Sequence, residues 1–178
     1  MAFTIGCVYK DANDQTSVAV WVEELQAMGD DSPVILYKPQ GVPPSDMSEL
    51  YISASDFVLG LQTITQRRFM LQFGKERAVC LDSTHGTNQY DFPLVTMMVI
   101  DDFGQGNLVA FLISNKEDET TLCVFFRTIN ARLPDDAAFT SSHVMTDDDG
   151  QYYNARTAVF GPAAKLLCAW LCCECVGS

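Results

Sequence analysis

The sequence lacks an unbroken hydrophobic run long enough to cross a membrane. No segment approaches the roughly eighteen apolar residues that a membrane helix needs. The first residues, MAFTIGCVYKDAND, also lack a basic stretch ahead of an apolar one, which is the pattern of a secretory signal. We therefore expect an intracellular globular protein with no membrane partner.

Basic residues are scarce as well. The chain carries 11 Lys and Arg against 23 Asp and Glu, which gives a formal net charge of −12. Because Lys and Arg supply most of the non-specific affinity for nucleic acid, this balance argues against a stand-alone nucleic-acid-binding protein. No basic cluster, zinc-finger spacing or helix-turn-helix pattern is present. Contact with DNA would therefore need another domain or another protein.

The seven cysteines do not form the pattern of a secreted, disulfide-bonded domain. Their number is odd, and four of them gather near the C-terminus as Cys168, Cys172, Cys173 and Cys175. This C-x3-C-C-x-C spacing does not match a standard zinc site. We expect a reducing compartment, with metal binding by the terminal cluster as an alternative.

The first 47 residues predict a small α/β accessory segment. In QTSVAVWVEELQAMG, apolar residues recur at helical spacing, and Gly29 can end the helix. A short strand, VILY, follows Pro33. The connection YKPQGVPPSD is rich in Pro and Gly and marks a boundary near residues 38–47.

From residue 56 onward the pattern predicts an α/β domain. Strands are predicted in DFVLGLQT, RAVCLD, PLVTMMVI, LVAFLIS and HVMTD, and helices in TQRRFMLQF, EDETTLCVFFRTI and YYNARTAVF. The last segment, AAKLLCAWL, predicts a second closing helix. An initial meander followed by alternating strands and helices indicates a mixed sheet flanked by helices.

Two acidic residues directly follow predicted strands, namely Asp82 and Asp147. A carboxylate at the end of a buried strand is held rigidly while its oxygens reach a crevice, as metal coordination requires. Two such acids on neighbouring strands could hold two Mg²⁺ ions about 3.5–4 Å apart for the cleavage of a phosphodiester. The pattern by itself also fits acids that merely begin surface loops. Asp101 and Asp102, in a predicted hairpin, are expected to be turn residues.

Cys80 and His85 raise the alternative of a thiol hydrolase, which the sequence disfavours. Cys80 lies inside an apolar run, where cysteines are usually inert core residues. His85 is instead expected to orient the loop after Asp82 or to face DNA, and Thr84, Gly86 and Asn88 are expected to shape that loop.

Several segments resemble the catalytic core of Mutator-like element (MULE) transposases, in particular the animal branch related to SWIM-zinc-finger proteins. They are CLDSTHGTNQYDFPLVTMMVIDDFGQGNLVAFLIS, FF-x-x-I, VMTDDDGQYYNA and LLCAW, within residues 56–170. The resemblance implies an RNase H-like mixed sheet and a DDE carboxylate triad, with Asp82 and Asp147 as its first two members. Asp148 is the alternative ligand beside Asp147. Mg²⁺ or Mn²⁺ as cofactor, DNA as the ancestral partner and a nuclear location are also implied.

The chain departs from the pattern of this family at several points. The third acid of the triad, a Glu on a downstream helix, has no counterpart, and Leu171 stands where the family has the His of C-x-x-H. Arg156 stands in place of a Trp, and Leu108 in place of a Pro. We therefore predict a truncated, transposase-derived domain over residues 56–170, followed by a divergent tail over residues 171–178, that is inactive or nearly inactive alone. Open alternatives are a domesticated, non-catalytic module that binds protein partners in the nucleus and a degraded transposon fragment.

Overall fold

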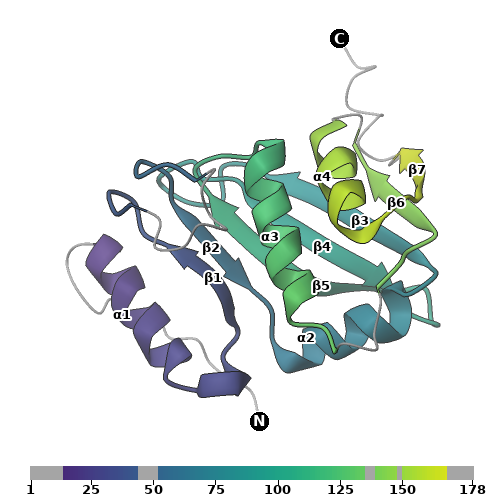
Figure 1. The fold of residues 1–178 in the computed structure, drawn as a ribbon, viewed down its shortest axis with the longest axis horizontal. Coiled ribbons are helices and arrows are strands. Elements are labelled where there is room, and N and C mark those ends of the chain that lie inside the picture. Colours follow the sequence, from purple (N-terminus) through teal and green to yellow (C-terminus); the bar gives the residue numbers. More distant parts are fainter. Residues whose placement is uncertain (1–13, 44–51, 135–138, 148–149, 168–178) are drawn as a thin grey trace.

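Seven strands form one mixed sheet with helices on both of its faces (Figure 1). The computed structural model describes residues 14–43, 52–134, 139–147 and 150–167. The strands are β1 (Val34–Lys38), β2 (Val58–Leu61), β3 (Ala78–Thr84), β4 (Leu94–Ile100), β5 (Gly106–Ser114), β6 (His143–Thr146) and β7 (Ala164–Leu167). The helices are α1 (Asp14–Gln26), α2 (Ile64–Phe69), α3 (Glu119–Ala131) and α4 (Gly150–Phe160), with a 3-10 turn η1 (Gly29–Asp31) and a π-helical turn η3 (Met70–Gly74).

The strand order is β1-β2-β5-β4-β3-β6-β7. From β1 to β3 all neighbouring strands in this order are antiparallel, whereas β6 pairs in parallel with both β3 and β7. The antiparallel part contains the predicted meander, and the parallel part follows from the alternation of strands and helices after it. The predicted fold class, a mixed α/β sheet flanked by helices, is confirmed.

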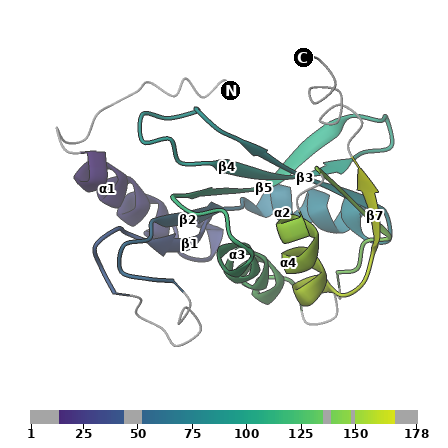
Figure 2. The same ribbon diagram turned by 90° about the horizontal axis from the view of Figure 1, so that it is seen from above.

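One face of the sheet is buried beneath α3 and α4, which lie side by side (Figure 2). Every second residue of β4 is fully buried, beginning at Val95. Phe125, Phe126 and Ile129 of α3 are also fully buried. Gly60 of β2 allows the close approach of α3, because a Cβ atom there would lie 3.2 Å from Cδ2 of Phe125. Burial of this apolar surface is the main stabilising contribution to the fold.

The helix α1 lies beside the opposite face of the sheet, next to β1 and β2 (Figure 2). The register places Tyr37, Leu59, Ile113 and Leu94 in one row across this face. All four are half-buried, and Trp21 of α1 keeps 39% of its surface exposed. The cover that α1 gives to this face is therefore partial.

The accessory segment contributes a strand to the same sheet. β1 forms one edge and pairs with β2 from Val34 opposite Leu61 to Lys38 opposite Val58. The division into segments 1–47, 56–170 and 171–178 stays a prediction. None of the helices in the described ranges is long and apolar enough to cross a membrane.

The predicted second closing helix over AAKLLCAWL is wrong in its first part, because Ala164–Leu167 forms the strand β7. Gly161, with a φ of +85°, and Pro162 separate this segment from α4. β7 then pairs in parallel with β6, so hydrogen bonding at the sheet edge overrides the helical preference of its residues. Residues 168–178, including the cysteine cluster, lie outside the described residues.

Candidate metal site

Neighbouring parallel strands bring Asp82 and Asp147 together. Cys80 of β3 is paired in register with Met145 of β6. Asp82 lies two residues beyond this pair within β3, on the face that carries Cys80, and Asp147 lies two residues beyond it, directly after the end of β6. The two acids, 147 − 82 = 65 residues apart in the sequence, therefore lie just past the paired part of two neighbouring strands.

Both acids are half-buried. Asp82 lies within β3, and its backbone carbonyl accepts a hydrogen bond from the hydroxyl of Thr96 on β4 at 3.4 Å. Asp147 is the first residue after β6, and its Oδ1 accepts from the hydroxyl of Thr146 at 3.2 Å. The sheet therefore holds the main chain of both residues, while part of each side chain stays accessible to ions and water.

The pair fits a hard divalent cation. Mg²⁺ prefers oxygen ligands and is commonly held by one or two carboxylates, with water and substrate phosphates completing its coordination. Within the described ranges, no group of three or more His, Cys, Asp and Glu side chains is placed to hold a metal ion. Two carboxylates, as in Asp82 and Asp147, are a donor set of the kind that Mg²⁺ uses. Asp148, the alternative ligand, lies outside the described residues.

The loop that follows Asp82 is organised by Asn88. Its Oδ1 accepts hydrogen bonds from the backbone N–H groups of Tyr90 and Phe92, both at 3.1 Å, and its Nδ2 donates to the carbonyl of Phe92 at 2.6 Å. Gly86 has a φ of +69°, in the left-handed region that favours glycine. The T-H-G-T-N motif therefore builds a defined loop beside the acid pair.

His85 and Cys80 make separate contacts. The Nε2 atom of His85 lies 3.4 Å from the Oε2 atom of Glu117, which ties the loop after Asp82 to the segment before α3. The thiol of Cys80 lies 3.9 Å from the sulfur of Met145. The rejection of a Cys/His nucleophile stays a prediction.

Asp101 and Asp102 are turn residues, as the sequence predicts. Oδ1 of Asp101 accepts from the backbone N–H groups of Phe103 and Gln105, both at 2.9 Å, in the β4–β5 hairpin. The hydrogen bond from Gln105 is the largest influence that lowers the pKa of Asp101. Asp102 forms an ion pair with Arg77 at 2.7 Å. These contacts at the hairpin account for both acids without a metal.

Arg156 of α4, which stands where the family resemblance leads us to expect a Trp, is completely buried. Its guanidinium donates to the carbonyl of Gly161 and to the hydroxyl of Ser141, both at 2.6 Å, and lies 5.7 Å from the ring centroid of Phe160. The buried Nε atom has no hydrogen-bond partner. Burial lowers the pKa of this guanidinium, and Tyr153 acts in the opposite direction. The side chain fills the space under α4 at the cost of burying a cation.

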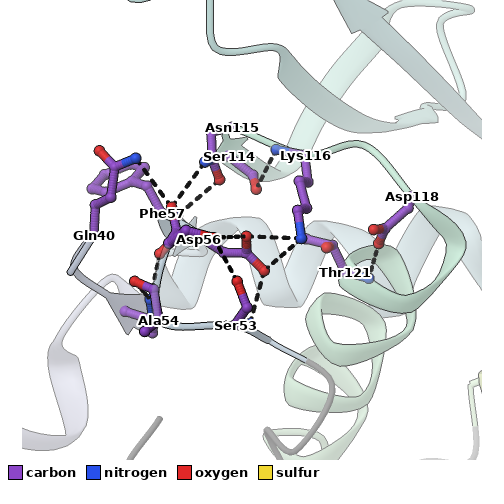
Figure 3. A network of polar contacts seen from close by, with 12 residues as sticks. Gln40, Ser53, Ala54, Asp56, Phe57, Ser114, Asn115, Lys116, Asp118 and Thr121 are labelled. Carbon is purple, nitrogen blue, oxygen red and sulfur yellow. Dashed lines mark hydrogen bonds and ion pairs between the residues drawn. The ribbon is translucent and has the colours of Figure 1, made fainter. Parts of the chain in front are cut away.

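A polar network that the sequence analysis did not single out joins β2 to the segment before α3 (Figure 3). The side chain of Asp56 is 2% exposed and accepts from the ammonium of Lys116 at 2.8 Å and from the backbone N–H of Ser53 at 2.8 Å. Beside them, Asn115 accepts from the backbone N–H of Phe57 at 2.8 Å. An acid that starts a strand gives little sequence signal of burial, because most such acids are solvated.

The RNase H-like domain of zinc finger SWIM domain-containing proteins 1/3 is the family whose model matches residues 48–166. The match includes both Asp82 and Asp147 and runs from the segment before β2 into β7. No curated protein matches the chain.

Proposed function

The chain belongs to the RNase H-like domain family of zinc finger SWIM domain-containing proteins 1/3, and we propose that Asp82 and Asp147 are its inherited divalent-cation site. In this proposal the domain descends from a Mutator-like transposase, and its ancestral reaction is the metal-dependent cleavage and transfer of DNA strands. The register of β3 against β6 supports the proposal, because the pair Cys80 and Met145 lies two residues before each of the two acids.

In this proposal, the residues of this chain would bind the divalent cation and orient the oxygen atoms that hold it. Asp82 and Asp147 would each present carboxylate oxygen to Mg²⁺ or Mn²⁺, and β3 and β6 would fix the direction from which these oxygens approach. When bound, the cation supplies Lewis-acid stabilisation of the charge that develops on a phosphodiester. The loop that Asn88 organises lies directly after Asp82 and would limit how the substrate enters.

The chain on its own is expected to show little or no nuclease activity. Its two-carboxylate site lacks the third acid that the family resemblance leads us to expect. A formal net charge of −12 also gives weak attraction for the phosphate backbone. Binding to DNA, and a place in the nucleus, would then depend on other domains or partners.

Metal binding and cleavage are tested separately. Calorimetric titration with Mn²⁺ should show a binding event that weakens about tenfold or more in Asp82→Asn and in Asp147→Asn. Asp91→Asn is the matched control, because Asp91 is an exposed acid near the same site whose left-handed φ of 55° an Asn tolerates. Equal Mn²⁺ binding by all four proteins would refute the site.

Cleavage is followed by nicking of supercoiled plasmid in Mg²⁺ or Mn²⁺. The expected result is no nicking above the rate of the Asp82→Ala variant. Robust nicking by the unmodified chain that Asp82→Ala abolishes would contradict the expected inactivity while supporting the metal site.

A non-catalytic role in binding protein partners is a second candidate. The observation that favours it is the acidic charge balance, which suits protein partners better than nucleic acid. Metal binding that is tight and is lost in Asp82→Asn would argue against a purely scaffolding role.

A further inference from the structure

A groove of about 610 Å³ lies between α1, the sheet and the loop after β3. Its floor is the row formed by Tyr37, Leu59, Ile113 and Leu94. One wall is α1 with Trp21, and the other is the segment 87–92. Its volume is within the range of about 300–1,000 Å³ that is typical of ligand sites.

The lining is strongly aromatic. Trp21, Tyr37, Phe57, Tyr90 and Phe92 all contribute to it, and we call this feature the aromatic groove. The rings of Phe57 and Phe92 are stacked with centroids 5.5 Å apart, and Tyr90 lies 5.7 Å from Phe92. Trp21 and Tyr90 remain 39% and 54% exposed, so part of each side chain is accessible. The faces of aromatic rings attract both proline rings and cations.

Among the described residues that line the aromatic groove, Asp14 is the charged one, and none of them is Lys or Arg. Its carboxylate accepts a hydrogen bond from the hydroxyl of Tyr90 at 2.7 Å. Burial raises the pKa of Tyr37, and the carboxylate of Glu23, which is not among the lining residues, raises it further. The aromatic groove is therefore complementary in charge to a cationic ligand.

We propose that the aromatic groove binds an extended, proline-rich peptide segment that carries arginine or lysine. Proline-rich segments adopt a preformed left-handed helix and dock into grooves lined by aromatic side chains. Arginine or lysine in the segment would lie over an exposed ring such as that of Trp21 and would face Asp14. The proposal does not depend on metal binding or on nuclease activity.

The position of the aromatic groove connects it to the acid pair. In the register of β3 and β4, Leu94 of the floor lies opposite Thr84, and Asp82 lies opposite Thr96. Because alternate residues share a face, Asp82 and the floor lie on the same face of the sheet. A peptide in the aromatic groove would thus lie next to the candidate metal site.

Single-stranded nucleic acid is the competing occupant of the aromatic groove, because bases also stack on aromatic rings. The described lining residues include no Lys or Arg to contact phosphate groups, which favours the peptide.

The test uses an array of ten-residue peptides with two prolines fixed three positions apart and the other positions varied among basic, neutral and acidic residues. A fluorescein-labelled thymidine decanucleotide is measured in parallel. The full chain should bind basic array members with dissociation constants on the order of 10–100 μM, and should bind the acidic members at least about tenfold more weakly. Failure to bind any member, or tighter binding of the oligonucleotide than of every peptide, would overturn the proposal.

Variants assign the binding to the aromatic groove. Trp21→Ala should weaken binding of the basic peptides about tenfold or more, and Asp14→Asn should reduce the preference for basic over acidic members about two- to fivefold. Phe103→Ala is the matched control, because Phe103 is an aromatic residue that is 90% exposed and does not line the aromatic groove. Far-ultraviolet circular dichroism and a thermal melt verify that each variant is folded. Unchanged binding in a folded Trp21→Ala variant would refute this location.

Discussion

Arg156 offers a direct test of the cost of burying a charge in this fold. It is fully buried, it donates hydrogen bonds to Gly161 and Ser141, and within the described part of the chain it forms no ion pair with a carboxylate. We compare Arg156→Met, which removes the charge but keeps a long side chain, with Arg156→Lys, which keeps the charge but loses the planar donor arrangement.

The expected magnitudes follow from these contacts. Two hydrogen bonds to a charged group contribute about 1.5–3 kcal/mol each, whereas burial of a cation without a carboxylate costs several kcal/mol. In Arg156→Met the two terms largely cancel, so the free energy of unfolding should change by less than about 2 kcal/mol. Arg156→Lys keeps the burial cost and loses at least one hydrogen bond, so it should destabilise by about 2–4 kcal/mol.

Urea unfolding followed by circular dichroism measures both variants, with the slope of the transition checked for constancy. Arg127→Met is the control, because Arg127 is exposed on α3 and its replacement should change stability by less than about 0.5 kcal/mol. If Arg156→Met were as destabilising as Arg156→Lys or more so, the charge itself would be stabilising and the reasoning would be refuted.

Two further predictions concern stability. Burial raises the pKa of Asp56, but hydrogen bonds from Lys116 and Ser53 outweigh this effect and hold it below its ordinary value. The stability from this pKa shift is therefore present above the unfolded-state pKa of about 3.9 and is lost as pH falls through the folded-state pKa. Asp56→Asn should thus be less stable than the unmodified chain at neutral pH. Between about pH 5 and about pH 3, the urea midpoint of Asp56→Asn should fall less than that of the unmodified chain. An equal fall of the two midpoints would contradict the assignment of this pH dependence to Asp56. Gly60→Ala should lower the free energy of unfolding by about 1–3 kcal/mol, because the new Cβ would lie 3.1 Å from Cβ of Leu36 and 3.2 Å from a ring carbon of Phe125. An unchanged urea midpoint in this variant would contradict the prediction and would show that α3 can shift.

Much of the sheet could be predicted because its strands are short apolar runs separated by turn residues. The run from Leu94 to Ile100 and the run from Gly106 to Ser114 are bounded by turn residues, and both form strands. Ala164–Leu167 could not be predicted in the same way, because its strand depends on pairing with β6 rather than on its own pattern. Four residues are too few to show a period.

The sequence shows that Asp82 and Asp147 each follow a short apolar run, but the prediction that Asp82 comes after the end of its strand is wrong, because β3 continues to Thr84. The placement of the two acids relative to each other depends on the register of β3 with β6, which no local pattern encodes. The aromatic groove was not foreseen for a related reason, since Trp21, Tyr37, Phe57 and Tyr90 come from segments that are far apart in the chain. Burial of Arg156 likewise depends on Ser141 and Gly161, which lie outside its own helical pattern.

The parallel pairing of β3 with β6 has a consequence for the order of folding. β3, β4 and β5 are consecutive in the chain and can pair through short loops, whereas β6 must close a much longer loop before it meets β3. We expect the meander to form first and the β3–β6 ladder late. Asp82 and Asp147 would then become neighbours only in the last stage, and a cation bound between them would slow unfolding more than it accelerates folding.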